Sequence, residues 1–123
     1  MQDHTQLRVW QRAHELHVYV HRATQQVRVR DTGSFRSQLR RATASIPANI
    51  AEGAGQETSA QFARFLTIAI ASDNEALSHV ASARDLNFLN SRDCARIHEE
   101  LQAVRAMLIL LLRRVQERDR AFD

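Results

Sequence analysis

Residues 97–115 read IHEELQAVRAMLILLLRRV. Within this run, apolar residues recur in steps of three and four, at Ile97, Leu101, Val104, Leu108, Leu111 and Val115. That spacing is typical of a helix that buries one continuous seam against neighbouring helices. It predicts a long amphipathic helix in a helical bundle.

Three breaks, at residues 31–34, 53–58 and 90–91, divide the chain into four segments, and the first three segments repeat the helical spacing. Ser34, Ser91, and Thr58 together with Gln61 are expected to cap the helix starts. Helices of similar length joined by short turns pack as antiparallel neighbours. The predicted fold is therefore all-α, a single antiparallel up-down four-helix bundle over residues 1–123.

The composition excludes several classes of protein. With 44% hydrophobic and 25% charged residues, the chain falls in the globular range. Three glycines and one proline are too few for an all-β sandwich. The longest apolar run, residues 107–112, is far shorter than the roughly 20 residues of a membrane helix. Because the first residues also lack the pattern of a secretory signal, we expect a cytoplasmic protein without a membrane partner.

The charge is distributed unevenly. All basic residues are arginines, and residues 1–41 hold eight of them against three acids, whereas the rest of the chain is slightly acidic. The planar fork of arginine suits phosphate, so this asymmetry favours a polyanionic partner. We expect Tyr19 to stack on a base. Phosphate contacts are expected from Arg8, Arg12, Arg22, Arg28, Arg30, Arg36 and Arg40. The alternative is a solvated helix face.

Two further stripes lie outside the predicted core. Ala103, Met107 and Leu110 form a second apolar line on the fourth helix, which a lone bundle buries on one side only. Contact with other copies of the chain is the favoured explanation, and an unusually wide core is the alternative. The first helix carries a row formed by Trp10, His14, His17 and His21. This row fits a seam against another subunit; a transition-metal site is the less favoured alternative, since no carboxylate or cysteine of that helix joins it.

Residues 39–53 read LRRATASIPANIAEG, and Pro47 inside this pattern predicts a kinked helix. A polar line of Arg41, Ser45, Asn49 and Glu52 borders the apolar stripe, and Arg41 is expected to pair with Glu52. Asp73 lies in the middle of the apolar stripe of the third helix. A carboxylate there is expected either to meet an arginine or histidine or to face a wet cavity.

The chain resembles the 23S rRNA intervening-sequence proteins in these motifs, in residues 7–13, 62–66 and 87–89, and in Ser72 with Glu75. The resemblance implies an antiparallel four-helix bundle that assembles into a homopentamer without established catalysis. Its structural signature here comprises Arg41, Ser45, Pro47, Asn49, Glu52, Gly53, Asp73 and Glu75. Two positions depart from the family pattern: Asp73 ends the Ala71-Ser72-Asp73 step where Gly-Ser-Leu is usual, and Gln56 stands where arginine is common.

In fold, the chain is more distantly similar to the accessory variability determinant proteins of diversity-generating retroelements. Those proteins are basic pentamers that bind nucleic acid and work with a reverse transcriptase. The similarity implies RNA or DNA as a partner of this chain, and a reverse transcriptase as a possible protein partner.

Catalytic motifs are missing from the sequence. The glycines at 53–55 lack the lysine of a phosphate loop, no nucleophile motif surrounds a serine, and no Glu-x-x-His pair offers a di-metal centre. We therefore expect no enzyme activity, cofactor or metal. The predicted function is a homo-oligomeric accessory protein that contacts RNA or DNA backbone, serving a reverse transcriptase or an rRNA-related process. The alternative is a protein-interaction scaffold whose basic face docks an acidic partner.

Overall fold

The computed structural model describes residues 2–25 and 32–121. A short 3-10 helix, η1 (His4–Gln6), precedes four long helices, which are α1 (Arg8–Ala23), α2 (Thr32–Ala54), α3 (Ser59–Asp85) and α4 (Ser91–Ala121). Within these residues all regular structure is helical, so the prediction of an all-α fold with four long helices is confirmed. None of the described helices combines the length and the apolar character that crossing a bilayer requires.

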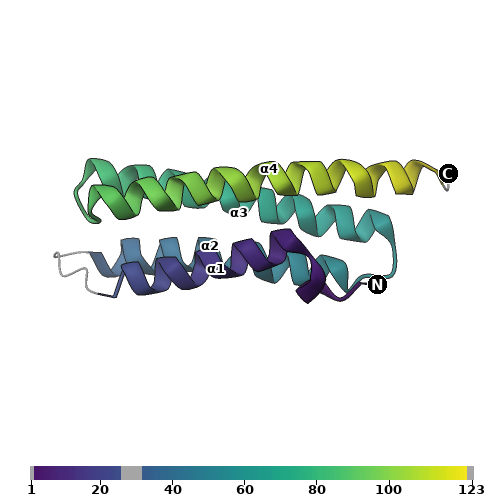
Figure 1. Cartoon of the computed structure of the whole chain (residues 1–123), viewed down its shortest axis with the longest axis horizontal. Helices are drawn as coiled ribbons and strands as arrows, with labels where there is room; N and C mark the ends of the chain where they lie inside the picture. The colour runs from purple at the N-terminus through teal and green to yellow at the C-terminus, as the bar shows by residue number, and fades with distance from the viewer. Residues whose placement is uncertain (1, 26–31, 122–123) are drawn as a thin grey trace.

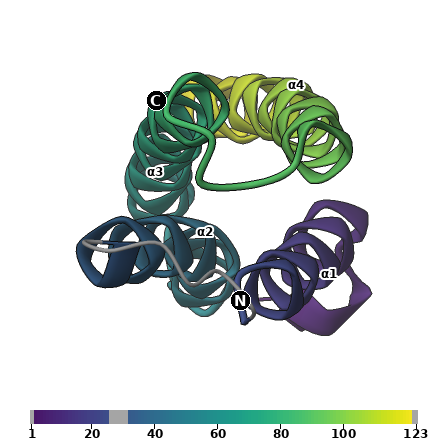
Figure 2. The same ribbon diagram turned by 90° about the vertical axis from the view of Figure 1, so that its left-hand side faces the viewer.

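The helices occupy four corners when the molecule is viewed along its long axis (Figure 2). Each packs against its two neighbours, and among the described residues the backbones of the diagonal pairs, α1 with α3 and α2 with α4, do not come as close. The turns at residues 55–58 and 86–90 lie at opposite ends of the molecule, and α4 extends past the start of α1 (Figure 1). The backbones of α1 and α4 approach each other over fewer residues than those of the other neighbouring pairs, and α1 is also the shortest of the four long helices.

The predicted apolar stripes form the core. Burying them removes apolar surface from water along the whole bundle axis, which is the main stabilising contribution to a fold of this kind. Buried positions from the stripes of α1, α2 and α4 are Val9, Ala13, Leu16, Val20, Leu39, Ala42, Ile46, Ile50, Ile97, Leu101, Val104 and Leu108.

One of the three predicted helix caps is confirmed. The Thr58 side chain accepts a hydrogen bond from the Gln61 N–H at 3.2 Å, at the start of α3. The prediction for Ser91 is wrong, because Asn90 accepts from the Asp93 N–H at 2.7 Å and its amide donates back to the Asp93 carboxylate. The prediction for Ser34 is also wrong: α2 already begins at Thr32, and Ser34 accepts from the side chain of Gln38.

The polar line on α2 ties this helix to α3. Pro47 is buried inside α2, and the helix continues past it to Ala54. Asn49 donates to the Ser45 carbonyl at 2.8 Å and to the Ser45 hydroxyl at 2.9 Å, and that hydroxyl lies 2.8 Å from the hydroxyl of Ser72 on α3. These bonds satisfy polar groups at the edge of the core.

The predicted pair of Arg41 and Glu52 is not formed. Both side chains are exposed, and no ion pair joins them in the part of the chain that the structure describes. Three helical turns separate these residues, which corresponds to about 16 Å along the axis, too far for a direct contact.

Asp73 is the one carboxylate in the buried core described by the structure. Its exposed fraction is 0%, and neither carboxylate oxygen has a hydrogen-bond partner. Of the two expected alternatives, pairing with an arginine or histidine is not found among the described residues, because the nearby Arg105 donates instead to the Asn74 side chain at 2.9 Å. The wet cavity stays a prediction. Burial raises the pKa of Asp73 to about 7, and the charge of Arg105 opposes that rise only in part. Glu75, two residues on, is exposed and lies 3.4 Å from His79.

Candidate nucleic-acid interface

Three contacts bring the end of α1, the start of α2 and the start of α4 to the same end of the bundle (Figure 1). The ring of Phe35 on α2 packs against that of Phe88 in the turn before α4, with 5.1 Å between centroids. Arg40 of α2 hydrogen-bonds to Thr24 just after α1. The hydroxyl of Tyr19 on α1 donates to the carboxylate of Asp93 on α4. Arginines from three helices therefore share this end.

We define the basic end as Arg22 of α1, Arg36 of α2, and Arg92 and Arg96 of α4. Arg36 is half-buried and the other three are exposed. Of the acids nearby, Asp85 forms an ion pair with Arg84 at 3.0 Å, whereas Asp93 forms none among the described residues and keeps its charge while it accepts hydrogen bonds from the neutral side chains of Tyr19 and Asn90. The positive charge of this end is therefore not cancelled by ion pairs within the described residues.

Arg92 and Arg96 were missing from the residues predicted from sequence. The excess of arginine over acidic residues in residues 1–41 predicted that the phosphate contacts lie there alone. The fourth helix, however, begins with two arginines one turn apart. The start of α4 lies beside the end of α1, so these arginines join the same surface. The spacing of Arg92 and Arg96, four residues apart at the start of a predicted helix, could have indicated from the sequence that both belong to the site.

Arg40, a predicted phosphate contact, is part of the fold. Its Nε donates to the Thr24 hydroxyl at 2.8 Å, and its Nη2 donates to the His21 carbonyl at 2.9 Å. Burial lowers the pKa of Arg40, and the like charge of Arg36 lowers it further. Arg40 therefore satisfies groups at the C-terminal end of α1, where helix carbonyls lack partners of their own.

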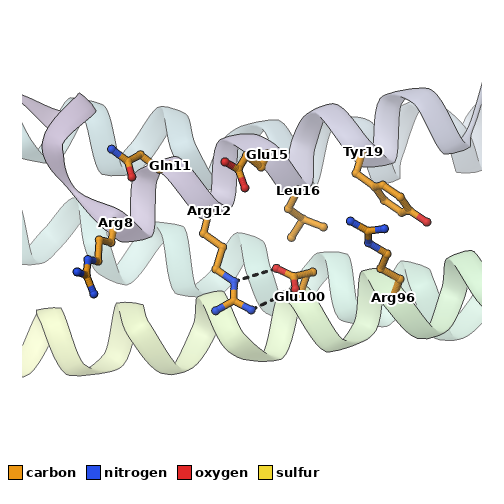
Figure 3. Close-up of a pocket in the computed structure, with 8 residues that line it drawn as sticks. All are labelled: Arg8, Gln11, Arg12, Glu15, Leu16, Tyr19, Arg96 and Glu100. Carbon is orange, nitrogen blue, oxygen red and sulfur yellow. Dashed lines mark hydrogen bonds and ion pairs between the residues drawn. The ribbon is translucent and has the colours of Figure 1, made fainter.

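Arg8 and Arg12 lie on the seam between α1 and α4, along a groove that reaches the basic end at Arg96. They line a groove of about 340 Å³ together with Leu16, Tyr19, Arg96 and Glu100 (Figure 3). Arg12 donates from Nε and Nη2 to the two carboxylate oxygens of Glu100, at 2.9 and 3.1 Å. This bidentate pair raises the pKa of Arg12 and lowers the pKa of Glu100. Arg8 is exposed and has no hydrogen bond or ion pair among the described residues.

Tyr19, the predicted stacking residue, is held on both its ring and its hydroxyl. The guanidinium of Arg96 lies 4.5 Å from the ring centroid, and the hydroxyl donates to Asp93. Burial raises the pKa of Tyr19, and the bond to Asp93 raises it further. A base can therefore stack on this ring only beside Arg96 or in its place. The predicted contacts Arg28 and Arg30 lie outside the described residues.

In the row of Trp10, His14, His17 and His21 on α1, the first two residues stack on each other within one chain. The ring of His14 lies parallel to that of Trp10, with centroids 4.9 Å apart, and His4 meets Trp10 edge-on at the same distance. Burial lowers the pKa of His17, and the charges of His14 and His21 add to that effect. Across the described parts of the chain, no three potential metal ligands gather in one place.

The second apolar stripe on α4 is only partly covered. Leu110 is 49% exposed, and Ala103 and Met107 are half-buried. Met107 and Leu110 line an apolar groove with Leu7 and Val9 near the start of α1. The structure thus leaves apolar surface at the positions predicted to contact another copy.

Two comparisons with known proteins bear on identity. No curated protein matches this chain. The family model of the 23S rRNA-intervening sequence protein matches residues 5–110, which take in α1, α2, α3 and most of α4. The match covers the motifs quoted above and most of the chain's length, and the protein therefore belongs to the 23S rRNA-intervening sequence protein family.

Proposed function

We propose that this protein is a non-enzymatic accessory protein that binds the backbone of RNA or DNA and acts as a homo-oligomer of antiparallel bundles in the cytoplasm. The observation that carries the proposal is the basic end, where Arg22, Arg36, Arg92 and Arg96 project from three helices without a cancelling ion pair among the described residues. A reverse transcriptase or an rRNA-related process is the proposed setting.

The chemistry of the basic end favours a phosphate ligand. Arg36 lies close enough to Arg40 to lower its pKa, so like charges are held together there. Such a cluster gains free energy when an anion enters it, and a phosphate backbone supplies anions at regular intervals. Guanidinium contacts to backbone oxygens position a protein without selecting a base sequence. We therefore expect salt-dependent binding with little sequence preference.

Assembly would multiply this effect. Leu110 and Met107 offer apolar surface to a second copy, and the Trp10–His14 row offers a second candidate contact. A closed ring of identical copies would present several basic ends, whose fields add. The number five follows from the family resemblance and is part of the proposal.

A titration of the purified protein with fluorescent oligonucleotides tests the proposal. Several unrelated single-stranded and duplex sequences are compared at low salt and again at rising salt. Micromolar or tighter binding to all of them, weakening steeply with salt, is the expected result. Absence of binding at low salt would overturn the proposal and favour a scaffold that docks an acidic protein.

A further inference from the structure

The groove between α1 and α4 collects arginines from both helices. Arg8 and Arg12 point from α1 toward α4, and Arg96 points from α4 toward α1 (Figure 3). The groove lies along the seam where the backbones of two neighbouring helices approach each other over the fewest residues, and it opens to the surface. From residue 8 to residue 19, α1 rises by about 16 Å, which is enough to follow a short length of an extended strand.

The three guanidinium groups differ in what holds them. Arg8 is free of hydrogen bonds and ion pairs within the described residues, and Arg96 lies over the ring of Tyr19. Arg12 is the one that an acid neutralises, through both oxygens of Glu100. Glu15 also lines the groove, and it forms no ion pair among the described residues (Figure 3). Among the described residues, Glu100 is therefore the carboxylate that forms an ion pair with these arginines across the seam, whereas Glu99 and Glu15 act on Arg12 only through their charge.

The Arg12–Glu100 pair is open to competition. The two side chains are 43% and 30% exposed, and exposed ion pairs contribute little to stability because water and salt screen them. A phosphate presents the same bidentate geometry to a guanidinium as a carboxylate does. A phosphate that enters the groove beside Arg8 can thus take the place of Glu100 on Arg12.

We propose that this groove binds the phosphodiester backbone of a single strand through Arg8 and Arg12, and that Glu100 competes with the strand for Arg12. The inference rests on the proposed nucleic-acid function and adds a second subsite, with its own restraint, to the basic end. Leu16 and Tyr19 give the groove an apolar and an aromatic wall, which suits the sugar and base of a strand. The Arg12–Glu100 ion pair keeps the binding of a single phosphate weak, so that a strand binds well only when several of its phosphates contact the arginines at once.

The test compares Glu100→Gln with Glu99→Gln in the full-length protein. Both variants remove one negative charge, but Glu99 is exposed and makes no ion pair among the described residues. Binding of a labelled single-stranded oligonucleotide is measured by fluorescence anisotropy at several salt concentrations. We expect Glu100→Gln to bind about three- to tenfold more tightly than Glu99→Gln with a similar salt slope, because the strand places a phosphate on Arg12 in both complexes and only the competition by Glu100 is removed.

Arg12→Gln in the Glu100→Gln background should cancel that gain. Arg8→Gln should weaken binding and lower the salt slope by about 0.7, whereas Arg64→Gln, an equal loss of charge on the outer face of α3, should leave the slope unchanged. The side chain of Arg8 makes no hydrogen bond or ion pair among the described residues, so replacing it should not disturb folding. The Arg8 variant therefore tests the groove even where a change at Glu100 disturbs folding. Equal binding by Glu100→Gln and Glu99→Gln, with equal slopes for Arg8→Gln and Arg64→Gln, would overturn the groove proposal alone. Failure of the unaltered protein to bind any oligonucleotide at low salt would overturn the proposed function itself.

Discussion

Arg40 of α2 donates from its Nε to the hydroxyl oxygen of Thr24, 2.8 Å away, at the end of α1. Thr24 is fully buried, and its own hydroxyl donates to the Val20 carbonyl at 2.7 Å. The bond therefore links two helices through a group that water does not reach. The arginines within residues 1–41 therefore fall into two classes. Some, such as Arg40, stabilise the fold, and others, such as Arg22, are free to contact a ligand.

The first prediction separates these two classes. Arg40→Gln should lower the free energy of unfolding by about 1–3 kcal/mol, because it removes hydrogen bonds from a charged donor to Thr24 and His21. Arg22→Gln, on the exposed face of α1, should change it by less than about 0.5 kcal/mol. Urea denaturation followed by circular dichroism measures both. Equal losses in the two variants would contradict the structural role of Arg40.

A second prediction concerns Asp73 and pH. A buried carboxyl group with its pKa raised to about 7 keeps its proton in the folded protein at pH values where the unfolded chain has lost it. The contribution of Asp73 to the free energy of unfolding therefore falls as pH rises from about 4 to 7, by up to roughly 1.4 kcal/mol for each pH unit. Above the pKa of the folded state this contribution no longer changes with pH. Asp73→Asn, which is neutral at every pH, should become more stable than the unaltered protein over the same window.

The control for Asp73 is Glu57→Gln in the turn before α3, whose side chain is exposed and forms no ion pair among the described residues. Thermal melts between pH 4 and pH 8 compare each variant with the unaltered protein, so that histidine titration cancels in the difference. A stability difference for Asp73→Asn that stays constant across this range would show that the buried carboxyl does not titrate as described.

The third prediction uses the two glycines at the end of α2. A Cβ at Gly53 would lie 2.9 Å from both Phe62 Cδ1 and Phe65 Cβ of α3, so Gly53→Ala forces the helices apart. We expect a loss of about 1–3 kcal/mol. At Gly55 the nearest atoms to a new Cβ are backbone oxygens 3.6 and 3.7 Å away, so Gly55→Ala should be neutral or slightly stabilising. Melting temperatures that drop equally for both variants would argue against close packing at Gly53.

The fourth prediction tests assembly. Leu110→Glu places a charge on the predicted contact stripe, while Leu86→Glu places the same charge on a leucine that is 60% exposed in the turn after α3. Because neither side chain belongs to the core, both variants should fold. Sedimentation velocity should show that Leu110→Glu shifts the protein toward the mass of one chain and that Leu86→Glu does not. A single-chain mass for the unaltered protein would contradict the proposed oligomer.

Much of the fold could be predicted from the sequence because it depends on local patterns. The heptad run from Ile97 to Val115 and the Thr58 cap each specify an element through residues close in the chain. Ser91 and Asn90 show where this approach fails, since both residues can cap a helix and only the geometry of the turn selects one.

The candidate site was harder to predict from the sequence than the fold, because its contacts join residues that are far apart in the chain. The pairing of Arg12 with Glu100, and of Arg96 with Tyr19, depends on the register of α1 against α4. No pattern within one helix fixes that register. The isolation of Asp73 likewise depends on its position relative to Arg105, which hydrogen-bonds to Asn74 instead.

The central claim is that arginines at the basic end bind nucleic-acid backbone, and the salt dependence of binding tests it most directly. The double variant Arg22→Gln/Arg36→Gln is compared with Arg64→Gln/Arg118→Gln, which removes the same charge from exposed positions on α3 and α4. The slope of log Kobs against log salt for a single-stranded oligonucleotide should become shallower by about 1.4 in the first variant, for two lost phosphate contacts, and stay unchanged in the second. Equal slopes in the two variants would contradict the claim.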